Sequence, residues 1–312
     1  MPDPEGGMPP GEPGETPAEI AMRVFVDHRE LLFSIVYNML GSVADTEDVL
    51  QETWLAWASR NTAPSSEAIT SPRAYLVRIA VNSALARQAS ISRRREDYAG
   101  PWLPEPLLTD GQVSDGAETM MRTQSVSMAL LVVLETLTPL ERAVFVLHEV
   151  FGYAHTEIAG ILDRSPTAIR QLAHRAREHV QARRPRYPTD PQVHQRLTER
   201  FVAAVAGGDL GALMQTLAPE VTMWTDGGGK ARAARTPVHG RDKIARVILG
   251  NAFRHPIPDL GIRYRRVNGE PSALLMSGSA PHMLVFLDLS PGGDQARGIY
   301  IVTNPDKLSR LR

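Results

Sequence analysis

The chain has 312 residues, of which 43% are hydrophobic and 22% are charged, and its formal net charge is −1 at pH 7. This length predicts two or three domains, and the apolar content suffices for hydrophobic cores. Cysteine is absent, which excludes disulfide bonds, thiolate metal sites and cysteine nucleophiles. The sequence also lacks a membrane-spanning apolar run and the basic-then-apolar start of a secretory signal, so we expect a cytoplasmic protein with no membrane partner.

The composition and the periodicity of apolar residues change several times along the chain. Residues 1–19 are rich in Pro, Gly and Glu and contain neither Lys nor Arg, which predicts a disordered tail. Residues 20–97 and 119–184 have helical periodicity, and the Pro- and Gly-containing stretch 98–118 separates them. Residues 190–312 combine helical and strand patterns. The predicted fold class is therefore multidomain, with two all-α domains joined by a linker and followed by an α+β domain.

The segment from Ala44 to Trp57 combines an apolar stripe with an acidic face. Leu50, Trp54 and Trp57 are spaced i, i+4 and i+7, which places them on one side of a helix. The polar residues that face away from this stripe are Glu47, Asp48, Gln51 and Glu52. Acidic residues in the first turns of a helix also suit its dipole, so the pattern by itself does not require a binding partner.

A second helix begins at Ser71 and Pro72, which form a cap and a first-turn proline. It continues beyond Asn82 into a basic end that contains Arg87 and Arg93-Arg94-Arg95. Arginines without nearby acids suit contact with phosphates, although a solvated helix end would have the same composition.

An acidic helix, a Ser-Pro-capped helix and a basic end, in this order, resemble region 2 of the sigma factors over roughly residues 24–97. The resemblance implies binding to the clamp helices of the β′ subunit of core RNA polymerase by Asp45, Glu47, Asp48, Gln51 and Glu52. It also implies recognition of the −10 promoter element as single-stranded DNA by Tyr75, Asn82, Arg87, Arg93, Arg94 and Arg95. The chain has Ala86 where the family usually has Asp, so the −10 sequence preference stays open.

The linker contains the segment Trp102-Leu103-Pro104-Glu105-Pro106-Leu107, whose alternating prolines favour an extended backbone. Its Trp and Leu side chains need to be covered. Three interpretations are open: packing on the neighbouring domains, a docking strip for the C-terminal domain, or a segment threaded into the polymerase cleft. In the last case the acidic side chains of Asp110, Asp115 and Glu118 would mimic the nucleic acid along its path.

Residues 156–184 have the pattern of a helix-turn-helix. The first helix is predicted over Thr156–Leu162, the turn at Asp163-Arg164, and the second helix from Pro166 with Ser165 as its cap. On the second helix one face is apolar, with Ile169, Leu172, Ala173, Ala176 and Val180. The opposite face carries Thr167, Arg170, Gln171, His174, Arg175 and Glu178. A packed stripe opposite Arg, Gln and Thr is typical of a recognition helix, and a generic basic helical hairpin is the alternative.

The segment Leu134–Phe145, together with Glu157-Ile158-Ala159 and Arg170-Gln171-Leu172, resembles sigma region 4. The resemblance implies contact with the polymerase β flap and recognition of the −35 element by Ser165, Thr167, Arg170, Gln171, His174 and Arg175. Regions 2 and 4 without a region 3 between them identify the chain as a member of the extracytoplasmic-function (ECF) sigma factors, with core RNA polymerase and promoter DNA as expected partners.

In the last domain, helices are predicted over 192–206, 209–217 and 242–253. Five strands are predicted, over Val221–Thr225, Ile262–Val267, Ser272–Ser277, Met283–Leu289 and Gly298–Thr303. The segments Ala206–Leu213 and Pro219-Glu220-Val221 resemble the opening of the SnoaL-like branch of the NTF2-like fold, in which helices wrap a curved sheet.

ECF sigma factors with such an extension form a recognised group, and three segments resemble its motifs. These are Trp102 to Leu107, then Asp226, Gly227, Gly228, Gly229 and Lys230, and finally Asn304, Pro305, Asp306, Lys307 and Leu308. The resemblance implies that the C-terminal domain replaces a separate anti-sigma factor, holds the two sigma domains together, and modulates their activity in cis. Whether it activates or inhibits stays open.

The alternative function is a helix-turn-helix regulator with a ligand-binding or enzymatic SnoaL-type domain. NTF2-like cones often bind small ligands, and Asp226, His239, Asp259 and His282 are candidates for a general base by residue type alone. His148, Glu149 and His155 lack the i, i+4 histidine spacing of a zinc protease site. We expect no enzymatic activity, no cofactor and no metal, and we leave a small regulatory ligand as a possibility.

Overall fold

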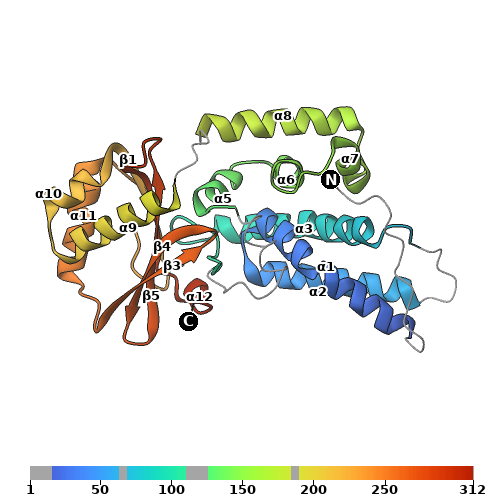
Figure 1. The fold of residues 1–312 in the computed structure, drawn as a ribbon, viewed down its shortest axis with the longest axis horizontal. Helices are drawn as coiled ribbons and strands as arrows, with labels where there is room; N and C mark the ends of the chain where they lie inside the picture. Colours follow the sequence, from blue (N-terminus) through green and yellow to red (C-terminus); the bar gives the residue numbers. More distant parts are fainter. Residues whose placement is uncertain (1–15, 63–68, 110–125, 184–189, 312) are drawn as a thin grey trace. The chain divides into compact units, whose positions relative to one another are not determined.

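The computed structural model describes residues 16–62, 69–109, 126–183 and 190–311. These residues form two compact units (Figure 1). The helical unit contains the described residues up to 93 together with Leu134–Arg183. The sheet unit contains residues 94–109, Val126–Val133 and the described residues from 190 onward. Within the described residues, no helix is long and apolar enough to span a bilayer.

The first part of the helical unit consists of α1 (Pro17–Leu40), α2 (Val43–Thr62) and α3 (Pro72–Glu96). A disordered tail was predicted over residues 1–19, but helix α1 already begins at Pro17. Thr16 and Glu19 form a capping box, in which the Thr16 side chain accepts from the Glu19 N–H and the Glu19 carboxylate accepts from the Thr16 N–H. The tail prediction is therefore wrong for residues 16–19, and residues 1–15 lie outside the described residues.

The predicted apolar stripe of α2 packs on α1. Leu50 and Trp57 are buried and Trp54 is half-buried, with its ring centroid 5.3 Å from that of Phe25. The indole N–H of the fully buried Trp57 donates to the carbonyl of Ala21 at 2.8 Å. This contact satisfies the polar atom of the side chain and fixes α2 against the start of α1.

The second part of the helical unit contains α6 (Pro139–Phe145), the π-helical turn η1 (Val146–Val150), α7 (His155–Leu162) and α8 (Pro166–Arg183). Asp163 joins α7 to α8 in the left-handed conformation, with φ of 52°, as predicted for the helix-turn-helix turn. The π-helical turn was not predicted, because one five-residue turn does not alter the spacing of apolar residues enough to be recognised.

The sheet unit contains α9 (Pro191–Ala206), α10 (Leu210–Gln215), α11 (Arg241–Arg254) and α12 (Pro305–Leu308). Its strands are β1 (Leu217–Asp226), β2 (Val238–His239), β3 (Leu260–Val267), β4 (Glu270–Ser277), β5 (Ala280–Leu289) and β6 (Ala296–Val302). They form one sheet in the order β2-β1-β6-β5-β4-β3, in which only the β1–β6 pairing is parallel among the strands described. The five predicted strands and three predicted helices are confirmed, and β2 and α12 are the short elements that were missed.

The sheet has an apolar core on each face. One core includes buried residues of α9, α10 and α11, such as Phe201, Leu213 and Ile244. The other joins sheet residues to Leu103 and Met128 and to Leu308 of α12. Helices α10 and α11 lie on the opposite side of the sheet from α12 (Figure 1). The second core is therefore completed by two segments that precede the sheet, at Leu103 and Met128, and by helix α12, which follows it.

The start of helix α5 (Met128–Leu134) belongs to this second core. Residues 126–133 pack with the sheet, although the sequence assigned them to the second helical domain. Residues 94–97, which the sequence placed in the first domain, also group with the sheet. The predicted linker boundary at 118 and 119 lies outside the described residues.

Candidate functional surfaces

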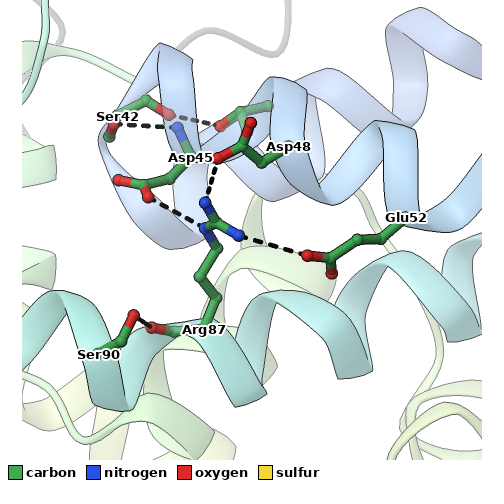
Figure 2. Close-up of polar contacts among 7 residues, drawn as sticks. Ser42, Asp45, Asp48, Glu52, Arg87 and Ser90 are labelled. Atoms are coloured by element: carbon green, nitrogen blue, oxygen red, sulfur yellow. Dashed lines mark hydrogen bonds and ion pairs between the residues drawn. The ribbon is translucent and has the colours of Figure 1, made fainter.

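The acidic face of α2 is paired with a single arginine of α3. Figure 2 shows the Arg87 guanidinium reaching Asp45, Asp48 and Glu52 at once. Its Nε donates to Asp45 Oδ1 at 3.0 Å, one Nη donates to Glu52 Oε1 at 3.3 Å, and the other Nη donates to the Asp48 carboxylate. The expectation that Arg87 lacks nearby acids is therefore wrong.

The carboxylates on this face differ in exposure. The side chain of Asp45 is 9% exposed, whereas those of Asp48 and Glu52 are 52% and 54% exposed. Glu47 pairs with Arg29 of α1 at 2.7 Å, and Gln51 is exposed. Four of the five residues predicted to bind the polymerase thus present polar atoms at the surface, while Asp45 is largely enclosed.

The residues predicted to bind the −10 element have intramolecular partners. The Tyr75 ring lies 5.9 Å from that of Trp57, and the Asn82 amide donates to the carbonyls of Arg78 at 2.8 Å and Ile161 at 3.1 Å. Arg93 and Arg94 are exposed, and the Arg95 guanidinium lies 3.5 Å from the centre of the Trp102 ring. Tyr75, Asn82 and Arg95 therefore make contacts within the chain that the sequence analysis did not predict.

Helix α8 presents the predicted recognition face to solvent. Thr167, Arg170, Gln171, His174 and Arg175 are exposed, while Ile169, Ala173, Ala176 and Val180 on the opposite face are buried. Ser165 caps the helix by accepting from the Ala168 N–H at 3.2 Å. Arg175 pairs with Glu141 at 3.1 Å, and His174 lies 3.5 Å from Glu178. The predicted division of α8 into a packed face and an exposed face is confirmed.

Asp226, at the end of β1, is fully buried and holds the linker to the sheet. Its carboxylate accepts from the Tyr98 hydroxyl at 2.6 Å, the Leu103 backbone N–H at 2.8 Å and the Lys307 ammonium at 2.7 Å. Lys307 also donates to the Leu103 carbonyl. Burial lowers the pKa of Lys307, and Asp226 opposes this effect. The pKa of the Tyr98 phenol is raised, mainly by burial and to a smaller extent by the hydrogen bond to Asp226.

Other residues of the three predicted motifs lie close to the Asp226 carboxylate. Two cations contact the Trp102 ring: the Arg95 guanidinium, 3.5 Å from its centre, and the Lys307 ammonium, 4.2 Å from its centre. Gly228 is left-handed, with φ of 59°, and a Cβ there would lie 2.3 Å from the Asn304 amide nitrogen, so only glycine fits. Asn304 donates to the Tyr98 hydroxyl at 2.8 Å and caps α12, which begins at Pro305. The three predicted motifs thus meet around Asp226.

The linker continues along the edge of the sheet. Leu107 donates to the Asn268 side chain at 3.1 Å and accepts from the Asn268 N–H at 2.8 Å. Leu108 forms a bridge with Val267, and Glu105 lies 3.7 Å from Arg310. Tyr98 and Asn268 are contact residues that the sequence analysis missed. The Asn-Gly pair at 268 and 269 signals a hairpin turn, but nothing in it indicates a linker contact.

The four candidate general bases differ in their surroundings. Asp226 is buried and its carboxylate accepts from four donors, which belong to Tyr98, Leu103, Gly228 and Lys307. The other three candidates, His239, Asp259 and His282, are exposed. His239 lies 3.0 Å from the hydroxyl of Thr222. Among the described residues, no group of three or more His, Asp or Glu side chains could hold a metal ion.

Comparison with known families defines the class of protein. Residues 24–94 match the family described as Sigma-70 region 2, and residues 127–180 match Sigma-70, region 4. The first match covers α1 to α3, and the second covers α5 to α8. Both helical parts of the chain are therefore those of a sigma factor.

Similar proteins narrow this class. The chain is 39% identical over 247 residues to the ECF RNA polymerase sigma factor SigJ of Mycobacterium tuberculosis strain H37Rv, covering 78% of each chain. It is 31% identical over 291 residues to a probable ECF sigma factor, SigI, of strain CDC 1551 of the same species, covering 91% of this chain and 93% of SigI. The crystal structure of M. tuberculosis SigJ aligns with a TM-score of 0.72 at 33% identity, covering 92% of this chain and 98% of SigJ.

The chain therefore belongs to the ECF RNA polymerase sigma factors, and its function is to direct transcription initiation. A sigma factor is not itself an enzyme.

Proposed function

We propose that the two sigma regions bind core RNA polymerase and a two-part promoter. In this proposal the exposed acids of α2 contact the β′ clamp helices, and α3 takes part in −10 recognition. Helix α8 enters the major groove at the −35 element, and region 4 contacts the β flap. The exposed Arg, Gln and Thr side chains opposite the packed stripe of α8 support this role, because a recognition helix needs such side chains for base edges and phosphates.

Replacing Arg170 with alanine is expected to weaken binding to promoters that depend on a −35 element. Arg170 is exposed, and its guanidinium donates to the hydroxyl of Thr167 on the same helix at 3.4 Å, so its charge is available to DNA. If it contacts a phosphate, the slope of log affinity against log salt should fall by about 1. Electrophoretic mobility shifts with the polymerase holoenzyme over a salt series measure this slope.

Arg177→Ala is the matched control for Arg170. It lies on the same helix, but its guanidinium pairs with Glu149 at 2.6 Å. We expect the salt slope of this variant to match that of the wild type. Equal slopes for the two variants would argue against the proposed orientation of α8 on DNA.

We propose further that the sheet unit modulates the sigma regions in cis, in place of a separate anti-sigma factor. The observation that carries this proposal is the buried Asp226 carboxylate, which binds the backbone of the linker at Leu103. Residues 98–109 directly follow region 2, and residues 126–133 lie at the start of region 4. Both segments pack with the sheet. A domain that holds both ends of the linker limits the separation that regions 2 and 4 can adopt.

Releasing the linker should therefore relax the spacing between promoter elements that the protein accepts. We expect Lys307→Met, which removes a donor to both Asp226 and the Leu103 carbonyl, to broaden the dependence of transcription on −10 to −35 spacing. At non-optimal spacings transcription should rise by at least about fivefold, the lower end of typical coupling between sites. Run-off transcription with core polymerase on promoters that differ by single base pairs measures this profile.

Lys230→Met provides the control for this experiment. Lys230 belongs to the neighbouring glycine motif and pairs with Asp306, but both side chains are more than half exposed. Its replacement should leave the spacing profile unchanged. If Lys307→Met also leaves the profile unchanged, modulation through the linker is refuted.

A further inference from the structure

The three acids of the α2 face that contact Arg87 form a column along the helix. Asp45, Asp48 and Glu52 are spaced i, i+3 and i+7, so their side chains emerge from one side of α2. Three carboxylates so close together repel one another, and without a cation the exposed two would turn apart into solvent. Instead the three carboxylates point toward one another, because all of them accept from the Arg87 guanidinium (Figure 2).

The geometry of this contact depends on the guanidinium group. Arg87 uses Nε for Asp45 and separate Nη atoms for Asp48 and Glu52, so each carboxylate has its own donor. A lysine ammonium is a compact charge on a flexible chain and lacks this planar arrangement of donors. The backbone carbonyl of Arg87 also accepts a hydrogen bond from the Ser90 hydroxyl within α3.

Burial divides the roles of the three acids. Asp45 is nearly enclosed, and its carboxylate needs the Arg87 charge as compensation for its loss of water. Asp48 and Glu52 are half exposed and would be well hydrated alone, so their bonds to Arg87 chiefly restrict their orientation. One cation against three carboxylates leaves an excess of negative charge on this face, and the exposed carboxylates carry it.

We infer that Arg87 is a positioning residue for polymerase binding, which holds Asp48 and Glu52 in the orientation that receives a cationic side chain of the polymerase. This inference rests on the proposed contact of α2 with core polymerase. Side chains that are ordered before binding lose less conformational entropy when the partner arrives, which strengthens the complex. Arg87, assigned from the sequence to −10 DNA, thereby acts through α2, and it links the helix that binds polymerase to the helix that follows it.

The test is a double-mutant cycle on the affinity of the full-length chain for core polymerase, measured without DNA. Arg87→Met alone would remove the cation that compensates the enclosed Asp45 carboxylate, so the reference background is Asp45→Asn combined with Arg87→Met, which neutralises both residues. Circular dichroism and thermal unfolding establish that this background is folded. Arg78→Met, which removes an exposed charge from the same helix, is the matched control and should bind core polymerase like the wild type.

We expect the neutral background to bind core polymerase about fivefold to tenfold more weakly, where tenfold is about 1.4 kcal/mol. Asp48→Asn should weaken binding about fivefold in the wild type and by less than about twofold in the neutral background, since coupling of this size is typical of contacting residues. Arg87→Lys should behave like the neutral background, because charge alone does not orient both carboxylates. A role of Arg87 in stability alone would not produce this coupling.

The possible failures are distinguishable. If Asp48→Asn and Glu52→Gln each bind core polymerase like the wild type, the proposed role of α2 is wrong. If both weaken binding, but Asp48→Asn does so by the same factor in the two backgrounds, α2 binds polymerase and Arg87 does not position its acids. Wild-type affinity of Arg87→Lys would likewise overturn the inference.

Discussion

Replacing Lys307 with methionine is expected to lower the opening free energy of the linker segment by about 3–5 kcal/mol, the usual cost of removing one partner of a buried ion pair. The Lys307 side chain is 11% exposed and that of Asp226 is 0% exposed. The variant leaves the Asp226 carboxylate with the donors of Tyr98, Leu103 and Gly228 but without a counter-charge. Methionine retains much of the aliphatic volume, so the change acts mainly through charge.

Hydrogen exchange at the Leu103 amide measures this effect directly. That amide donates to Asp226, and it exchanges only when the linker leaves the sheet. The double variant Asp226→Asn with Lys307→Met should recover most of the loss, because a neutral pair carries no uncompensated charge. Lys230→Met, at an exposed pair, should cost less than about 1 kcal/mol. Equal losses for Lys307→Met and Lys230→Met would contradict the structural role of the buried pair.

Local sequence patterns predicted much of the fold. The helix-turn-helix was located to within one residue, because Asp163, Ser165 and Pro166 are turn and cap residues followed by an apolar stripe. The strands of the sheet were found because their apolar residues are continuous or alternate. Each of these features depends on residues that are neighbours in the sequence.

Contacts between distant segments were the part that local patterns could not supply. Arg87 lies 35 residues or more from the acids it binds, and Tyr98 lies 128 residues from Asp226. The basic end of α3 was therefore interpreted as a phosphate-binding surface, although two of its arginines, Arg87 and Arg95, contact α2 and Trp102. The resemblance of the three motifs to those of a known group predicted that they act together. It did not predict that they meet around the Asp226 carboxylate.

Replacing Trp57 with alanine is expected to destabilise α1 and α2 by about 3–5 kcal/mol, the range found for large aromatic side chains truncated in a core. Trp57 is fully buried, its indole donates to the Ala21 carbonyl, and its ring lies beside Tyr75 of α3. Alanine would leave a cavity between three helices and remove the bond from the indole to the Ala21 carbonyl. Trp57→Phe keeps most of the ring volume and loses the hydrogen bond, so about 1–2 kcal/mol should be lost.

Hydrogen exchange across α1 and α2 separates this local loss from unfolding of the sheet unit, which should keep its wild-type protection. Leu55→Ala, on the same helix but 64% exposed, should change the opening free energy by no more than about 0.5 kcal/mol. Because Trp57 fixes the helix that carries Asp48 and Glu52, Trp57→Ala should also weaken core polymerase binding, and Leu55→Ala should keep α2 in place. If Trp57→Ala costs no more than Leu55→Ala, then packing of Trp57 against α1 does not determine the stability of this region.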